Sequence, residues 1–313
     1  MTYRIDPRGA PAEGLRDALA DRLDKAIAAL EDWPKGLHEA IHDARKKFKK
    51  YRGALLLMRG VNRDVARGQN ARIRDAARLL GDARDAAALV ETATAIRDAA
   101  KDERERAILA DLVDRLTARR DRLIEADEAL EARMADVVSA CREARSVVEA
   151  LPQKGKRKRH ISSIAAGYAR TIRRGRDALK AASRSGEAED FHELRKHVKY
   201  HGMHCELLAG LWPSVMDARM AEAKAAGDKL GEDHNLAALA EALAAENNIP
   251  VPARAAIDEI IAAHSAGWRS DGLAAASRLF AGDAQATAQW VVELFEAASG
   301  EQEGGTDRAL TET

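Results

Sequence analysis

The chain has 313 residues, of which 46% are hydrophobic, 33% are charged and 4% are aromatic. This length supports a substantial hydrophobic core, and the composition excludes an intrinsically disordered chain. No apolar run approaches the roughly 18 residues that a membrane-spanning helix needs, and residues 1–11 contain no hydrophobic core of a signal peptide. The two cysteines, Cys141 and Cys205, are too few for a disulfide framework. We therefore expect a cytoplasmic protein.

Scarce aromatic residues, seven prolines and abundant Ala, Leu, Arg and Glu favour helices. Apolar residues recur at helical period and no strand-like alternation is present, so the predicted fold class is all-α. In chain order, helices are predicted at residues 11–32, 35–59, 64–80, 83–100, 102–150, 159–183, 187–210, 214–230, 233–246, 252–266 and 284–299. Gly and Pro residues, Gly81 and Gly231 among them, mark most of the breaks.

The segment 151–160 is rich in Pro, Gly and Lys and divides the chain near its middle. We predict an N-terminal helical bundle at 10–150, this basic linker, and a C-terminal bundle at 161–299. The tail, residues 300–313, is polar and is predicted to be disordered.

Equal numbers of basic and acidic residues, 51 each, conceal a strong asymmetry. Residues 206–313 carry 7 Lys/Arg and 18 Asp/Glu, a net charge of −11, so residues 1–205 carry +11. Residues 42–52 (HDARKKFKKYR) contain six basic residues and one acid, and residues 154–176 contain nine basic residues and no acid. Such local fields attract polyanions even when the whole chain is neutral.

The sequence repeats itself at an offset of 150 positions. Residues 41–46 (IHDARK) align with 191–196 (FHELRK), and residues 80–82 (LGD) align with 230–232 (LGE). One offset that holds over about 40 residues without a gap indicates an internal duplication. We predict two helical bundles that face each other across a pseudo-twofold axis.

Each copy of the repeat places cations on one helix face. His42, Arg45, Lys49 and Arg52 fall within about 80° of one another, and His38 joins them one turn earlier; we term these residues the first basic stripe. The second basic stripe contains His192, Arg195 and Lys199, with Gly202 in the place of Arg52. Brought together by the pseudo-symmetry, the two stripes would line one basic groove or channel.

Phosphate suits these side chains, because Arg donates in bidentate fashion to phosphate oxygens, Lys supplies a mobile charge, and His charges near pH 6.5. A linear polyanion bound by several of them would lose affinity steeply with added salt. The alternative is that Arg45 and Arg195 pair with acids on neighbouring helices.

The motifs at 37–52 (LHEAIHDARKKFKKYR) and 191–213 (FHELRKHVKYHGMHCELLAGLWP), each followed by an L-G-[DE] turn, resemble the CHAD family, the conserved histidine α-helical domain. Residues 172–179 (IRRGRDAL) are similar to a YRRGR-type helix of that family, with Ile172 where an aromatic residue is common. The resemblance extends over residues 10–299. It implies two four-helix-type bundles related by a pseudo-twofold axis, a basic central groove or pore, and non-catalytic binding of inorganic polyphosphate.

The resemblance also implies which residues bind. The family's basic positions fall on the two basic stripes, and further candidates are Arg173, Arg174, Arg176, Arg74, Arg78 and Lys224. Gly202 departs from the pattern, so the second half would hold its ligand less tightly. We expect inorganic polyphosphate as the partner, an association with polyphosphate granules, and no cofactor.

Three other functions compete with this one. His38 with His42, and His197, His201 and His204 with Cys205, have helical metal-ligand spacing, although the second group points away from the stripe and is more typical of core or surface histidines. The run at 154–159 (KGKRKR) could meet a nucleic-acid backbone, yet no nucleic-acid-binding motif accompanies it.

The third alternative is a phosphoryl-transfer enzyme that uses the same groove. Such chemistry normally requires Mg²⁺ held by carboxylates, whereas Asp43 and Glu193 point off the stripes. The acids at the L-G turns, Asp82, Asp85, Glu232 and Asp233, are expected to cap the following helices. No P-loop or other catalytic motif is present, so we predict no enzyme.

Overall fold

The computed structural model describes residues 3–34, 36–100, 102–125, 129–151, 155–244 and 250–300, apart from the side chains of residues 38, 82–84, 124, 125 and 300. The first half contains α1 (Pro11–Glu31), α2 (Leu37–Met58), α3 (Arg63–Leu79), α4 (Gly81–Ala99), α5 (Glu103–Glu125) and α6 (Leu130–Glu149). The second half contains α7 (Arg157–Ser185), α8 (Ala188–Leu207), α9 (Pro213–Ala244), α10 (Val251–Leu279) and α11 (Ala284–Gly300). The predicted all-α class is confirmed for these described ranges, which contain no strand.

Local signals in the sequence set several helix ends. The side-chain oxygen of Asn62 accepts a hydrogen bond from the backbone N–H of Val65, which caps the start of α3. Gly186 ends α7 with φ +70°, a left-handed conformation that glycine adopts without a steric penalty. The predicted break at Gly81 is confirmed as the start of α4.

Three predicted boundaries are wrong. The helix expected at 252–266 continues as α10 to Leu279. The single helix expected at 102–150 is described as two helices, since α5 is given as far as Glu125, Ala129 lies in a turn, and α6 begins at Leu130. The break expected at Gly231 is absent, since α9 runs through it. A Cβ at Gly231 would lie 3.3 Å from Nε of Arg195, so this glycine makes room for a neighbouring helix and does not end its own.

The continuous α9 also overturns the capping expected of Glu232 and Asp233, which lie in its interior. Asp233 is buried, where its carboxylate accepts hydrogen bonds from Ser265 Oγ and from Arg269 Nε at 2.8 Å. Asp85 likewise does not cap α4, whose N-cap residue is Leu80. Its carboxylate instead forms an ion pair with Arg45. Asp233 and Asp85 thus join helices that are distant in the sequence.

The helix bounds repeat at the offset of the sequence motif. A shift of 150 residues places α1 within α7 and α2 over α8. The same shift places α3 and α4 together on α9, α5 within α10, and α6 over α11. The duplicated sequence is therefore accompanied by a duplicated order of helices, with α3 and α4 fused into one element in the second half.

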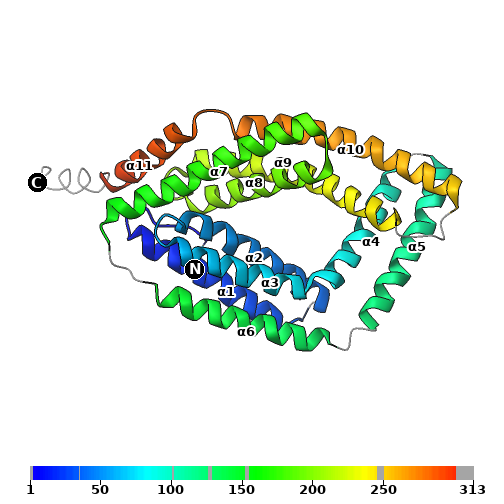
Figure 1. Cartoon of the computed structure of the whole chain (residues 1–313), viewed down its shortest axis with the longest axis horizontal. Coiled ribbons are helices and arrows are strands. Elements are labelled where there is room, and N and C mark those ends of the chain that lie inside the picture. The colour runs from blue at the N-terminus through cyan, green and yellow to red at the C-terminus, as the bar shows by residue number, and fades with distance from the viewer. Residues whose placement is uncertain are drawn as a thin grey trace, which may run out of the picture.

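The helices form two layers that pack on each other at the left and are bridged at the right (Figure 1). In that view α1, α2, α3 and α6 make the lower layer and α7–α11 the upper one, while α4 and α5 connect them at the right. One cluster of buried residues unites both halves and includes Phe48 and Tyr51 of α2 and Tyr168 of α7. A second cluster joins α4 and α5 to α9 and α10, with Ile96 and Leu239 among its members.

Burial of these large side chains contributes about 1.5–3 kcal/mol each, so the two layers are held in a fixed relation by their shared core. None of the described helices has the length and apolar character needed to span a membrane. The predicted disordered tail comprises residues 300–313, of which 301–313 lie outside the described residues.

Candidate anion-binding site

The two motif helices, α2 and α8, meet at equivalent residues. Gly53 and Met203 are 150 positions apart, and a Cβ on Gly53 would lie 3.0 Å from Sδ of Met203. Beside this contact, Nε2 of His204 is 2.9 Å from the carbonyl oxygen of Gly53. The lack of a side chain at Gly53 thus allows the two helices to pack closely at this crossing.

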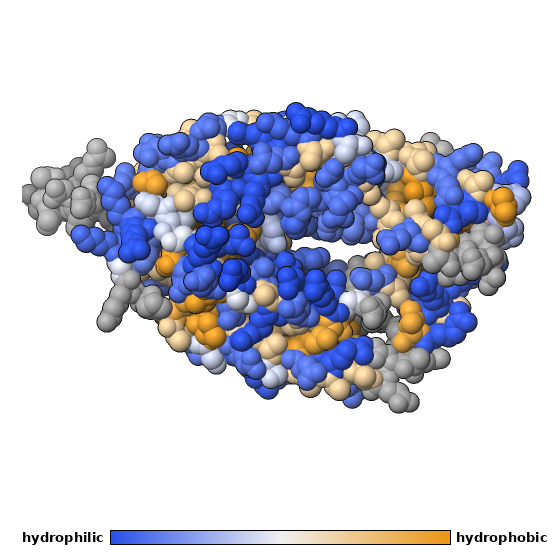
Figure 2. All heavy atoms as spheres, viewed as in Figure 1, coloured by the Kyte–Doolittle hydropathy of each residue, from blue (hydrophilic) through white to orange (hydrophobic). Residues whose placement is uncertain are grey.

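The molecule is hollowed between its two layers. Figure 2 shows an opening that lies between α8 and α9 on one side and α2 and α3 on the other, with α4 beyond its right end. Mostly hydrophilic residues cover both edges of this opening (Figure 2). We term it the central opening.

The second basic stripe packs on α9. The rings of His192 and His234 lie 4.3 Å apart between centroids, and their Nδ1 atoms are 3.2 Å apart. Arg195 lies over Gly231, and the stem of Lys199 lies over Gly227, where a Cβ would be 3.5 Å from Cγ of the lysine. Burial, with the neighbouring charge of Arg195, lowers the pKa of Lys199 to about 8.

Charges from both halves act on one imidazole. The pKa of His234 falls to about 4, chiefly because of burial and then because of the positive charges of His192, Arg195, Lys199 and Lys49. Lys49 belongs to the first basic stripe and the other three residues to the second. The structure therefore brings the two stripes within electrostatic reach of each other.

Arg45 has a second task in the first basic stripe. Its Nη1 donates to the carbonyl oxygen of Ala77 at 3.0 Å, at the end of α3, and its Nη2 lies 3.9 Å from a carboxylate oxygen of Asp85. Arg45 therefore links α2 to the junction of α3 and α4, and the carboxylate of Asp85 partly neutralises its charge. On the other side, the carboxylates of Asp228 and Glu232 act on both Arg195 and Lys199.

Residues 17–244 match the family model of the CHAD domain, which covers more than half of the chain. The chain belongs to the CHAD family. In fold it is similar to the crystal structure of the CHAD domain from the plant Ricinus communis, with a TM-score of 0.60, 20% identity, and coverage of 90% of this chain and 94% of that one. It is also similar to PptA from Streptomyces chartreusis, with a TM-score of 0.57, 13% identity, and coverage of 84% and 98%. No curated protein matches the sequence.

Several other predicted residues of this CHAD protein have local partners. On α3, Arg74 and Arg78 are exposed and pair with Asp75, and on α9 Lys224 pairs with Asp228 at 2.7 Å. Nε of Arg176 lies 3.4 Å from the carbonyl oxygen of Phe280. His38 belongs to α2, but its side chain lies outside the described part of the chain.

Arg52 and Arg174 line a separate cavity of about 160 Å³ between α2, α3, α7 and α8. Its other cations are Arg59, Arg170 and Lys196, and we term it the arginine pocket. Sequence reasoning missed these three residues, although Arg59 follows Arg52 by two helical turns and continues the first stripe. Arg173 adds its charge from the neighbouring position on α7 and acts on Arg170.

The helical histidines of α8 are buried in the CHAD core. His197 lies 2.9 Å from an Oε1 of Glu193, His201 contacts the thiol of Cys205, and His204 contacts Gly53 as described. These contacts explain the spacing that resembled a metal motif. Among the residues that the structure describes, no group of three or more His, Cys, Asp or Glu side chains is placed to hold a metal ion.

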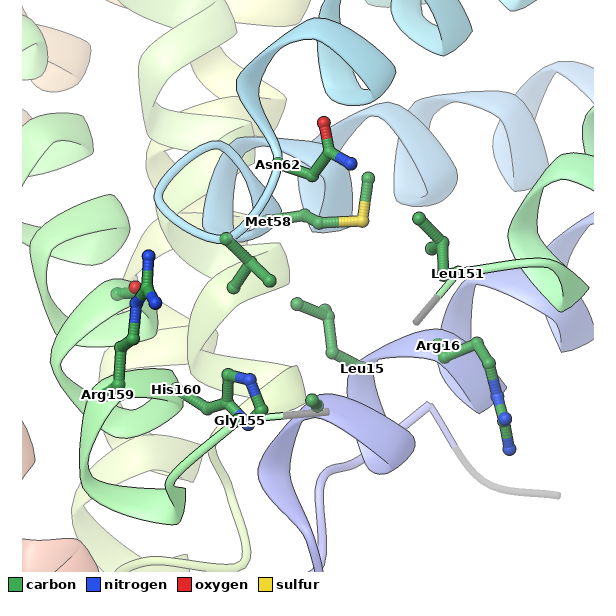
Figure 3. A pocket seen from close by; sticks show the side chains of 11 residues that line it. Leu15, Arg16, Met58, Asn62, Leu151, Gly155, Arg159 and His160 are labelled. Carbon is green, nitrogen blue, oxygen red and sulfur yellow. The ribbon is translucent and has the colours of Figure 1, made fainter. Parts of the chain in front are cut away.

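Another cavity, of about 140 Å³, lies where α1, the end of α2 and the start of α7 meet (Figure 3). Leu15, Met58 and Leu151 form an apolar wall, and Arg16 directs its guanidinium away from it (Figure 3). No residue of the two basic stripes lines this cavity. This mainly apolar cavity is therefore distinct from the arginine pocket and from the two basic stripes.

Proposed function

We propose that this CHAD protein binds inorganic polyphosphate in the central opening without transforming it. One observation carries the proposal, namely that Lys49 of the first stripe and Arg195 and Lys199 of the second act on the same imidazole of His234. A group of cations drawn from two helices into a partly buried site favours a polyanion, whose negative charge would offset their mutual repulsion.

The crossing of α2 and α8 supports the predicted pseudo-twofold axis. In a twofold arrangement, a residue that contacts its own counterpart lies on the axis, and Gly53 and Met203 are such a pair. Lys49 and Lys199 each stand one turn before that contact. Equivalent cations on the two helices suit a ligand with a regular repeat of identical charges, as polyphosphate has.

The second half departs from the first for a packing reason. A Cβ at Gly202 would lie 3.2 Å from Cβ of Ala223, so a long side chain like that of Arg52 would not fit between α8 and α9. Asp228 and Glu232 further offset the charges of Arg195 and Lys199. Both features favour tighter binding along the first stripe.

The carboxylates that directly follow the two stripe histidines in the sequence support binding over turnover. Glu193 is engaged by Lys196 and His197, and Asp43 lies 3.6 Å from Nζ of Lys46. Carboxylates committed in this way do not offer the free oxygens that hold Mg²⁺ beside a reacting phosphate.

Titration calorimetry with long-chain polyphosphate tests the proposal against its alternatives. We expect binding at low salt, no release of orthophosphate with or without Mg²⁺, and little displacement by single-stranded RNA at equal phosphate concentration. Orthophosphate release that requires Mg²⁺ would favour an enzyme, and complete displacement by RNA would favour a nucleic-acid-binding protein.

A further inference from the structure

The arginine pocket differs from the central opening in shape. It is a cavity of about 160 Å³ formed where α7 packs on α2, and it has room for roughly five water volumes. Gly167 of α7 makes this approach possible, because a Cβ there would lie 2.8 Å from Cα of Leu57. Arg170 and Arg174, one and two turns beyond Gly167, are thereby brought beside Arg52 and Arg59.

The guanidinium groups of this pocket lack neutralising partners. Within the described residues, Arg59, Arg170 and Arg174 form neither a hydrogen bond nor an ion pair. The pKa values of Arg59 and Arg170 are lowered, first by burial and then by the charge of Arg174. Arg63, at the start of α3, adds a further positive charge to both.

Acidic compensation inside the pocket is small. Glu193 is the acid among its lining residues, and its carboxylate is taken up by Lys196 and by His197, whose Nε2 lies 2.9 Å away. Arg52 is held in place by Asn70, whose Oδ1 accepts from Nε at 3.0 Å. This amide partner is neutral, and the carboxylate that acts on Arg52, that of Asp75, already pairs with Arg74 and Arg78. Partly buried like charges repel strongly, so such a cluster is stabilised when an anion enters it.

We propose that the arginine pocket binds a terminal phosphoryl group, presented either by a short inorganic oligophosphate or by the end of a polyphosphate chain. A terminal phosphoryl group carries close to two negative charges at neutral pH, as a phosphomonoester does, and so suits a dense cluster of arginines. The small cavity holds a chain end, whereas the central opening passes a long chain. Binding of the end of a polyphosphate chain rests on the proposed function, whereas binding of a short oligophosphate does not.

Calorimetry with tripolyphosphate tests the pocket directly. We expect Arg170→Gln with Arg174→Gln to weaken tripolyphosphate binding at least tenfold. The matched control is Lys180→Gln with Arg184→Gln, which removes two exposed cations at the same spacing on the same helix; we expect less than a twofold change. Lys49→Gln with Lys199→Gln should also change tripolyphosphate affinity less than twofold. Helicity measured by circular dichroism should be the same in all three variants.

The proposal is overturned if the pocket variant binds tripolyphosphate as the wild type does, or if the α7 control weakens binding equally. A second titration identifies the source of the phosphoryl group, using long-chain polyphosphate with free ends or with ends blocked as phosphoramidates. A loss of affinity on blocking, present in the wild type and absent in the pocket variant, supports the chain end. If free-ended and blocked polyphosphate bind with equal affinity, while the pocket variant still loses tripolyphosphate binding, the ligand of the pocket is a short oligophosphate. If long chains do not bind and tripolyphosphate still does, the proposed function fails and the pocket stands.

Discussion

His192 and His234 face each other across α8 and α9 with their Nδ1 atoms 3.2 Å apart. Burial and the nearby cations lower the pKa of both, that of His234 to about 4, so in the free protein the pair is neutral at pH 7. The stripe histidine was expected to charge near pH 6.5, and its surroundings move that titration to lower pH. A bound polyanion adds negative charge and therefore raises both pKa values.

The first prediction is that polyphosphate binding takes up protons. Calorimetry at pH 6 in two buffers of different ionisation enthalpy should give different binding enthalpies, with the sign of net uptake. His192→Gln combined with His234→Asn should reduce this difference. Identical enthalpies in the two buffers for the wild type would show that the histidine pair does not sense the ligand.

The second prediction concerns Lys199, whose pKa is about 8 in the free protein. Because only the protonated amine attracts the polyanion, affinity should fall as the pH rises from 7 to 9. Lys199→Arg keeps the charge over this range, so its affinity should change less between these pH values. The comparison of the two pH profiles by calorimetry checks this, and equal slopes would place the titrating group elsewhere.

The third prediction concerns Gly175, within the IRRGR motif. A Cβ at this position would lie 2.3 Å from the ring of Phe280, so Gly175→Ala should lower the free energy of unfolding by about 1–3 kcal/mol. Gly68, in the exposed part of α3, has no neighbour within 4 Å of such a Cβ, and Gly68→Ala should stabilise by about 1 kcal/mol. Urea unfolding measures both changes, and a stabilised Gly175→Ala variant would contradict the packing described.

The fourth prediction concerns acid stability. Burial lowers the pKa of His204 to about 4 and lowers that of His201 well below its ordinary value, so the unfolded chain binds their protons more readily. The stability that these neutral histidines provide is complete above pH 6.5 and is lost as the pH falls toward 4. Each contributes a loss of up to about 1.4 kcal/mol per pH unit in this range. Urea unfolding at pH 7 and pH 5 checks the loss, which should be smaller in His204→Gln.

The sequence predicts the helices well where glycine or proline interrupts a helical pattern, as at Gly81 and Gly186. It fails at Gly231, because the need for that glycine comes from Arg195 on another helix. It fails again between α5 and α6, where residues 126–129 contain neither glycine nor proline. A boundary of the last kind depends on tertiary packing, which local propensity does not report.

The basic stripes follow from helical period alone, since their residues share one helix. Other neighbours depend on how α9 and α7 pack on the motif helices. This packing places His234 beside His192, and it places Arg170 and Arg174 in one pocket with Arg59. The repeat offset contains part of this information, because it predicts that α2 and α8 are equivalent. The arginine pocket has no such signal, since its residues come from four helices.

The most direct measurement is the salt dependence of polyphosphate affinity for the wild type and for Lys49→Gln with Lys199→Gln. The matched control is Lys25→Gln with Lys229→Gln, two lysines that pair with Asp21 and Asp271. We predict a steep loss of wild-type affinity with salt, a slope reduced by about two in the site variant, and an unchanged slope in the control. A flat wild-type slope, or a site variant that binds like the control, would contradict polyphosphate binding in the central opening.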